Sequence, residues 1–251
     1  MTTKPTTRPV NNTSTQKKGF TLIQLLVALA ILGVLVALLL PAAQRRVPGG
    51  ARRTQCKMYL KQIGLALHNY HDAFQAFPPA YTVDENGKPL HSWRTLILPF
   101  LDQQALYEKI DLSKPWDDPA NEAAFKTGIP GYQCPSSPAD VSSTHTTYMA
   151  VVTANSCFHP TEARLMSEIT DDHGKTIMVI EVDTDQAVHW MSPMDADESL
   201  VLGIGPKTKH AHSGGYQALF VDGSVRFLGE QSTAADRLAM ISIAGNEQVD
   251  P

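Results

Sequence analysis

A single apolar run near the N-terminus constrains this chain more than any other feature. The run extends from Phe20 to Leu40, and Thr21 and Gln24 are its only polar members. At a rise of about 1.5 Å per residue, a helix of this length spans roughly 31 Å, which matches the hydrocarbon core of a bilayer. We therefore predict a transmembrane helix over residues 20–43.

A cleaved secretory signal is the alternative interpretation of this run. The apolar part of such a signal is usually about 7–15 residues long, and small residues mark the cleavage site after it. The run is longer than that, and Leu40-Pro41-Ala42-Ala43 fits the cleavage pattern poorly. The sequence therefore favours an anchor that stays attached to the protein.

Charge divides the chain into two unlike parts. Residues 1–71 hold ten Lys or Arg and no acidic residue, whereas residues 72–251 hold eleven Lys or Arg against twenty-five acidic residues. A nucleic-acid-binding protein would carry its basic residues on the folded body, and this body is acidic. We therefore predict no nucleic-acid partner, and the pattern favours a basic end at a membrane with a body in solvent.

The region after the run has the pattern of a long amphipathic helix. Pro48-Gly49-Gly50 should break a helix, so we place a kinked joint over residues 44–53. Beyond it, apolar residues recur at steps of three and four from Leu60 to Phe77, and Pro78-Pro79 should end the helix. One apolar helix face must be buried against another element, and later segments supply strands.

Clear strand patterns come late in the chain, at 176–182, 217–221 and 224–228. Asp222-Gly223 is typical of a two-residue hairpin turn. Such a turn would set Phe220 opposite Val225 and Ala218 opposite Phe227, with the two Phe rings on one apolar face. We expect an α+β domain over residues 54–251, in which an antiparallel sheet packs on the amphipathic helix.

The segment around the start of the apolar run resembles a processing motif. Lys17-Lys18-Gly19-Phe20-Thr21-Leu22-Ile23-Gln24-Leu25-Leu26-Val27 is similar to the prepilin cleavage and methylation motif of type IV pilins and type II secretion pseudopilins. The resemblance implies that a prepilin peptidase cuts between Gly19 and Phe20 and methylates the new N-terminal Phe20. It also implies a pilin-like fold.

The same resemblance implies a topology. Residues 1–19 would be a disordered, basic leader on the cytoplasmic side, and the protein would cross the inner membrane once. Its body would lie in the periplasm or at the cell surface. The charges beside the run do not settle this orientation by themselves, because Lys and Arg flank it on both sides.

Gln24 departs from the motif, because pilins usually have Glu at the fifth mature position. The resemblance implies that such a Glu neutralises the α-amino group of a neighbouring subunit during filament assembly. A neutral amide can accept a hydrogen bond from the amine but cannot cancel its charge in lipid. Cleavage is therefore expected, while assembly with other pilin-like subunits stays open.

Several segments of the body resemble the bacterial family called domain of unknown function 1559. They include residues 56–71, the segment Cys134-Pro135-Ser136, and a closing motif in which His212 is followed after nine residues by Asp222-Gly223. The resemblance implies an architecture rather than a biochemical role.

The chain has three cysteines, Cys56, Cys134 and Cys157, which form no C-x-x-C pair. We therefore predict no structural zinc site. In an oxidising compartment one disulfide is expected, and three pairings are open. The pair of Cys56 and Cys134 is preferred because both lie in segments that resemble the family.

A calcium site is one interpretation of three alternating acidic residues. Glu181, Asp183 and Asp185 would project from one side of a strand, and carboxylate oxygens suit Ca²⁺, which major pseudopilins hold in a loop. The alternative is that acidic residues on an edge strand discourage association between sheets. No other cofactor is expected.

Two histidine patterns are candidates for chemical sites. His68 and His71 have a spacing that can serve one metal, but no third ligand lies nearby in the sequence, which favours surface histidines. His212 with Asp222 could form an acid–base pair, yet no nucleophile motif surrounds the neighbouring serines. The sequence therefore predicts no catalytic residue and no enzyme.

Together these features predict a membrane-anchored, prepilin-like protein with a structural role, such as a pseudopilin or a subunit of a surface structure. The alternative is a binding module that a pilin-like helix tethers outside the cytoplasm. A binder of glycans or peptides would expose aromatic side chains in a cleft, and the candidates are Trp93, Trp116 and Trp190.

Overall fold

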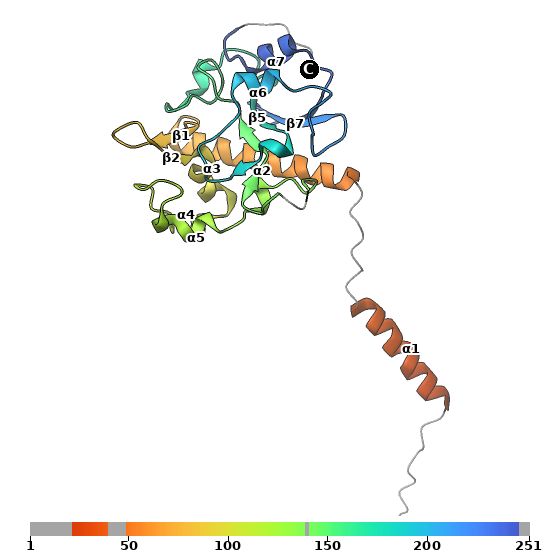
Figure 1. Ribbon diagram of the computed structural model, residues 1–251. Coiled ribbons are helices and arrows are strands. Elements are labelled where there is room, and N and C mark those ends of the chain that lie inside the picture. Colours follow the sequence, from red (N-terminus) through yellow and green to blue (C-terminus); the bar gives the residue numbers. More distant parts are fainter. Residues whose placement is uncertain (1–21, 40–48, 139–140, 246–251) are drawn as a thin grey trace, which may run out of the picture. The chain divides into compact units, whose positions relative to one another are not determined.

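The computed structural model of the chain describes residues 22–39, 49–138 and 141–245. It consists of two units, residues 1–47 and 48–251 (Figure 1). The leader predicted over residues 1–19 and the processing residues Gly19 and Phe20 lie outside the described residues.

Helix α1, Leu22–Leu39, is the described element of the first unit, and its sequence contains no charged residue. The large apolar side chains from Leu22 to Val34 are exposed. Part of the span predicted over residues 20–43 is therefore helical. Among the described residues, no helix combines the length and the apolar character that crossing a bilayer requires.

The second unit is an α+β domain with antiparallel strands, as predicted. Its helices are α2 (Gly49–Phe74), α3 (Trp93–Leu96), α4 (Gln104–Tyr107), α5 (Glu122–Phe125), α6 (Glu198–Leu202) and α7 (Ala234–Ile241). Its strands are β1 (Tyr81–Val83), β2 (Pro89–Ser92), β3 (His145–Thr146), β4 (Tyr148–Ala150), β5 (Ile177–Glu181), β6 (Val188–His189), β7 (Gly215–Phe220) and β8 (Val225–Gly229). Short 3₁₀ turns join them, including η3 (Pro130–Tyr132).

A four-stranded antiparallel sheet with the order β4-β5-β7-β8 is the centre of this domain. Strands β1 and β2 form one further antiparallel pair, and β3 and β6 form another. All five residues of β5 and all six of β7 are buried, because helices cover both faces of the sheet.

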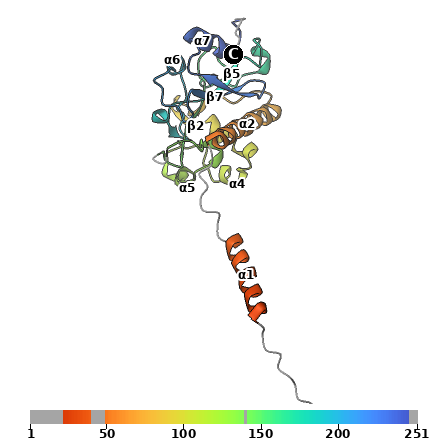
Figure 2. The same ribbon diagram turned by 90° about the vertical axis from the view of Figure 1, so that its right-hand side faces the viewer.

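Two hydrophobic cores lie on the two sides of this sheet. On one side, α2 packs its buried stripe, including Leu60, Ile63 and Leu67, against residues such as Leu219. On the other side, α6 and α7 cover a second core that includes Phe220. Figure 2 shows α2 just below β7, with α7 and α6 toward the top of the domain.

Helix α2 confirms the amphipathic pattern but differs from the prediction at both ends. Residues 49–53, which we assign to a kinked joint from the sequence, form its first turns, because Ala and Arg after the two glycines are strong helix formers. The helix ends at Phe74, before Pro78, where Gln75 adopts φ +60°. Phe74 is exposed, so the buried stripe stops earlier than expected.

The hairpin between β7 and β8 is confirmed, but its register differs by one residue from the prediction. Leu219 pairs with Val225, and Ala218 pairs with Arg226. Gly223 N donates to Phe220 O and Phe220 N donates to Ser224 O, each at 2.9 Å, so the loop contains three residues. A type I turn followed by a left-handed residue has this pattern, and Gly223 supplies the positive φ of +76°.

This register separates two rings that the sequence places on one face. Phe220 is buried in the second core, where the Arg226 guanidinium lies 3.7 Å from its ring centre. Phe227 is half-buried, and Arg53 of α2 lies 3.3 Å from its ring centre. The prediction of a shared face is wrong because a three-residue loop shifts β8 by one position, which reverses the face of each side chain.

Candidate metal centre

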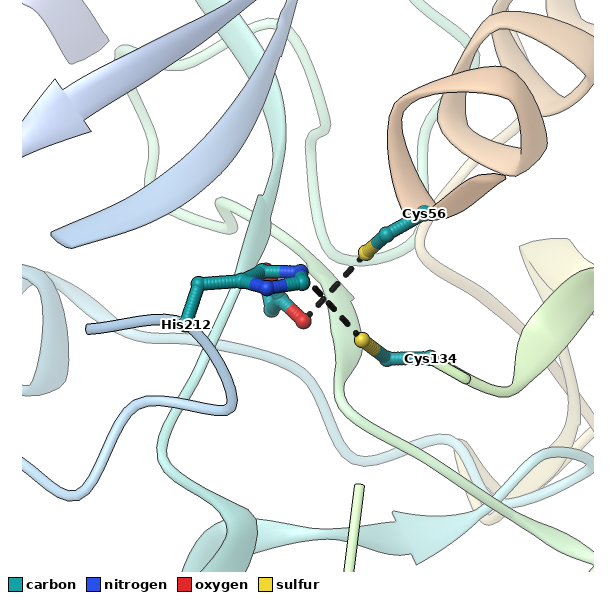
Figure 3. Close-up of side chains that lie close together, drawn as sticks. Cys56, Cys134 and His212 are labelled. Carbon is teal, nitrogen blue, oxygen red and sulfur yellow. Dashed lines mark hydrogen bonds and ion pairs between the residues drawn. The ribbon is translucent and has the colours of Figure 1, made fainter. Parts of the chain in front are cut away.

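Four buried side chains from distant parts of the chain meet at one point in the α+β domain. They are Cys56, Cys134, Glu181 and His212, and we call them the Cys–Glu–His cluster. Their ligand atoms, two sulfurs, a carboxylate oxygen and an imidazole nitrogen, all lie within 4.8 Å of one another. Figure 3 shows the two cysteines and His212 approaching a common centre from different directions.

Each residue of the cluster is positioned by its local structure. Cys56 lies one helical turn before Leu60 on the buried stripe of α2. Glu181 is the last residue of β5, and Cys134 follows η3. His212 precedes β7, where it forms a bridge with Gly215. The cluster therefore joins the start of the long helix, the end of a central strand and two loops.

The distances within the cluster are short but are not those of a tight hydrogen-bond network. Cys56 Sγ lies 3.4 Å from Glu181 Oε1, and Cys134 Sγ lies 3.5 Å from His212 Nε2. His212 Nε2 lies 3.6 Å from Glu181 Oε2. This last distance exceeds the usual N–H···O range of about 2.7–3.2 Å. The four side chains are only 0–6% exposed, so bulk water does not solvate their polar atoms.

Polar groups around the cluster face its sulfur and oxygen atoms. The Tyr148 hydroxyl lies 2.9 Å from Cys56 Sγ. The backbone N–H of Ser136 donates to Cys134 Sγ at 3.4 Å, and that of Gln217 donates to Glu181 Oε2 at 3.5 Å. These donors would stabilise negative charge on the thiolates and the carboxylate.

Contact and burial shift the acid–base equilibria of the cluster. The hydrogen bond with the Cys56 thiol lowers the pKa of Cys134, and His212 and Glu181 add to this effect. The same contact, followed by burial, raises the pKa of Cys56. Burial raises the pKa of Glu181 well above its usual range.

The arrangement differs from that of a nucleophilic triad. In a triad the nucleophile and the carboxylate contact opposite nitrogens of the histidine. One nitrogen accepts the proton of the nucleophile, while the N–H of the other is held by the carboxylate. Here Cys134 Sγ and Glu181 Oε2 both face Nε2 of His212. Groups that converge on one nitrogen surround a point in space, which is the arrangement of ligands around an ion.

Comparisons with known protein families match two parts of the chain. Residues 49–201 match the model of a family described as a protein of unknown function, DUF1559. This match covers more than half of the chain. The chain belongs to the DUF1559 family. Residues 14–40 match the prokaryotic N-terminal methylation motif, which confirms the resemblance read from the sequence around Gly19 and Phe20.

Neither the curated proteins nor the solved structures contain a match to the chain. The matched range of the DUF1559 domain includes three residues of the Cys–Glu–His cluster, and His212 lies beyond it. The description of the family assigns no role to any of them.

The structure places the preferred disulfide pair together without a bond. Cys56 and Cys134 are both in the cluster, but both are free thiols, as is Cys157. The lack of a C-x-x-C pair counts only against zinc sites whose ligands lie close together in the chain. In this cluster each ligand comes from a separate segment of the chain.

The predicted calcium candidates do not form one group. Strand β5 ends at Glu181, so the alternation does not continue to the next two acids. Glu181 is buried in the cluster, whereas Asp183 and Asp185 interact with Lys209. Asp183 Oδ2 accepts from the Lys209 backbone N–H at 2.8 Å, and Asp185 pairs with its ammonium at 2.5 Å.

The residues of the closing motif also have separate positions. His212 belongs to the cluster, whereas Asp222 is exposed in the hairpin turn and accepts from Ser224 N at 2.8 Å. Gly223 supplies the left-handed conformation of that turn. The motif therefore combines a buried ligand-type side chain with the turn that forms the β7–β8 hairpin.

The other candidate residues, two histidines and two tryptophans, pack against or within the core of the domain. The rings of His68 and His71 both contact Phe77. Trp93 and Trp190 are at most 1% exposed and lie in the core. Neither tryptophan is available to line an open cleft.

Proposed function

We propose that this DUF1559 protein is a prepilin-like envelope protein that prepilin peptidase cleaves between Gly19 and Phe20. The methylation motif over residues 14–40 carries the proposal. The motif includes the apolar run and is followed by the DUF1559 domain, which begins at residue 49. This order of leader, apolar helix and extracytoplasmic domain is the one that the processing machinery of pilin-like proteins handles.

The proposed location is the inner membrane, with residues 20–43 as a single anchor. Residues 20–40 contain no charge, and the described apolar side chains of α1 are exposed. An exposed apolar helix is stabilised by lipid or by other apolar helices. The N-terminus would be cytoplasmic, and the acidic body would lie in the periplasm or at the cell surface.

The proposed role is structural and not enzymatic, as a pseudopilin or a subunit of a surface structure. Its partners would be prepilin peptidase, a pilus or secretion assembly machine and other pilin-like subunits. The deep burial of the Cys–Glu–His cluster supports this role, because a substrate could not reach its side chains without a large rearrangement.

A tethered binding module is the second candidate function, and Gln24 is the observation that favours it. A subunit without the assembly carboxylate could remain a monomer that captures a partner outside the cell. The burial of Trp93 and Trp190 argues against a cleft lined with these rings, so such a module would use another surface. Sedimentation of the native protein separates the two candidates, since only a polymerised subunit pellets as filaments.

The processing step can be tested by mass spectrometry of the mature N-terminus. We expect a chain that begins with N-methylated Phe20 in cells with active prepilin peptidase. Gly19→Val should leave the leader attached, because the residue before the cut changes shape. Gly33→Val is the matched control, since Gly33 lies within α1 with open space around it, and processing should continue. An intact leader on the unmodified protein would contradict the proposal.

A further inference from the structure

We propose that the Cys–Glu–His cluster holds one zinc ion as a closed, structural site. Neither the description of the family nor that of the methylation motif assigns a metal to these residues. The proposal concerns the α+β domain alone and does not depend on how the N-terminus is processed.

The donor set is the first argument. Zinc in proteins is bound by cysteine sulfur, histidine nitrogen and carboxylate oxygen, and structural sites have four protein ligands in a tetrahedron. The cluster supplies two sulfurs, one nitrogen and one carboxylate. Calcium and magnesium prefer sites made of oxygen ligands, so a pair of sulfurs selects against them.

The spacing of the donor atoms is the second argument. With zinc bonds of about 2.3 Å to sulfur and about 2.0–2.2 Å to nitrogen or oxygen, a tetrahedron has N–S and S–O edges of about 3.6 Å and an N–O edge of about 3.4 Å. Cys134 Sγ lies 3.5 Å from His212 Nε2, and Cys56 Sγ lies 3.4 Å from Glu181 Oε1, which are close to two such edges. His212 Nε2 lies 3.6 Å from the other carboxylate oxygen, Oε2. Since the four ligand atoms all lie within 4.8 Å of one another, small movements of the side chains would bring them to tetrahedral positions around an ion.

The charge balance of the core is the third argument. Glu181 is fully buried, and within the described residues its only ion-pair partner is His212. A carboxylate and two thiols without a Lys or Arg partner are costly to bury in ionised form. A divalent cation would neutralise two of the three negative charges that the ligands carry when deprotonated.

The groups around the cluster are those expected around metal ligands. Thiolates and carboxylates that bind a metal commonly accept hydrogen bonds from a second layer of donors. The Tyr148 hydroxyl and the backbone N–H of Ser136 face the two sulfurs, and the backbone N–H of Gln217 faces the carboxylate. The two sulfurs and the carboxylate would therefore each keep a polar neighbour besides the ion.

A disulfide between Cys56 and Cys134 is the competing use of these residues. It would explain the two sulfurs but would leave Glu181 buried with His212 and weak contacts only. The zinc site gives all four side chains a role. It would also fasten the first turns of α2 to the end of β5, and thus hold the helix on the sheet near the point where the domain begins.

Metal content and the spectrum of a cobalt-substituted protein test the proposal. The full chain is purified in detergent through a tag without histidine, from cells grown in ordinary medium or in zinc-depleted medium with cobalt. We expect about one zinc ion per chain in the first preparation. The cobalt form should show thiolate-to-metal charge transfer in the near ultraviolet and the strong visible bands of a tetrahedral ion.

Two substitutions locate the ion. Cys134→Ser and His212→Gln should each reduce the bound zinc at least about tenfold at a fixed low concentration of free zinc. Cys157→Ser is the matched control, because Cys157 is a buried cysteine outside the cluster, and it should keep the full metal content. If the first two variants fail to fold, the stoichiometry and the cobalt spectrum of the unmodified chain still decide the question.

Three results would overturn the proposal. The first is a Cys56–Cys134 disulfide in the native protein, seen as a linked peptide pair under non-reducing conditions. The second is a protein with free thiols that takes up no zinc when the ion is supplied. The third is a bound ion that is retained equally by the cluster variants and by Cys157→Ser.

Discussion

Arg94 Nη1 lies 2.7 Å from Asp195 Oδ1, and the two side chains are 0% and 3% exposed. The guanidinium also donates to Trp190 O at 3.2 Å and to Met194 O at 2.8 Å. The same carboxylate oxygen accepts from Trp93 Nε1 at 3.1 Å. This buried pair joins α3 to the segment before α6, where it holds the indole of Trp93 and the backbone of Trp190.

Removing the negative charge of this pair should destabilise the domain strongly. Asp195→Asn keeps the shape of the side chain but leaves the buried Arg94 charge without a counter-ion, so the free energy of unfolding should fall by about 3–5 kcal/mol. The measurement is denaturant unfolding of the full chain in mild detergent. Glu122→Gln is the control, because it removes an acid from the exposed pair with Lys126 and should change little. Equal effects would show that the buried pair has no special importance.

The N-cap of α6 should make a small contribution to stability that depends on pH. Asp197 Oδ1 accepts from Leu200 N at 2.8 Å, and this bond lowers the pKa of Asp197. A lowered pKa gives stabilisation that is present above the ordinary value, near 4, and is lost as the pH falls through the lowered value.

Two substitutions at this cap separate the hydrogen bond from the charge. Asp197→Ala should cost about 1 kcal/mol at neutral pH, because it removes the acceptor. Asp197→Asn keeps an acceptor and should be close to the unmodified protein, but without this dependence on pH. Unfolding curves at pH 7 and near pH 3 measure both effects. An alanine variant whose deficit is the same at both pH values would contradict the prediction.

Gly215 should be the glycine at which a methyl group is least tolerated among the described strand residues. A Cβ at this position would lie 2.0 Å from the backbone oxygen of Leu228, which cannot move without distorting β8. Gly215→Ala should therefore cost at least about 1–3 kcal/mol in unfolding free energy. Gly229 is its partner in the β7–β8 pairing and has open space around it, so Gly229→Ala is the matched control. Similar stability of the two variants would show that Gly215 and the backbone oxygen of Leu228 do not lie this close together.

Gln24 should limit self-assembly if the protein is a pilin-like subunit. Gln24→Glu should increase the amount of protein in pelleted filaments, because it restores an ion pair where water cannot screen the charge. The test compares cells that express either form at equal levels. Abundant filaments from the Gln24 form, with no gain from Glu, would show that this position does not limit assembly and that helix packing suffices.

Much of the fold could be predicted because its causes are local. The stripe of α2 around Leu60, Ile63 and Leu67, the strand at β5 and the left-handed turn at Gly223 all follow from periodicity or turn chemistry within a few residues. The processing motif before α1 is equally local, and the family comparison confirms it. These features need no knowledge of the rest of the chain.

Other features were decided by the tertiary structure. The register of the hairpin depends on its three-residue loop. This register differs by one residue from the predicted one, and it places Phe220 and Phe227 on opposite faces. Sequence patterns mark every residue of the Cys–Glu–His cluster, but they assign these residues to different features. The two cysteines are assigned to a disulfide, Glu181 to a calcium site and His212 to the closing motif. Their spacing along the chain contains no information about which loops pack against the start of α2. Only the burial of that helix on the sheet brings two sulfurs, a carboxylate and an imidazole within 4.8 Å of one another.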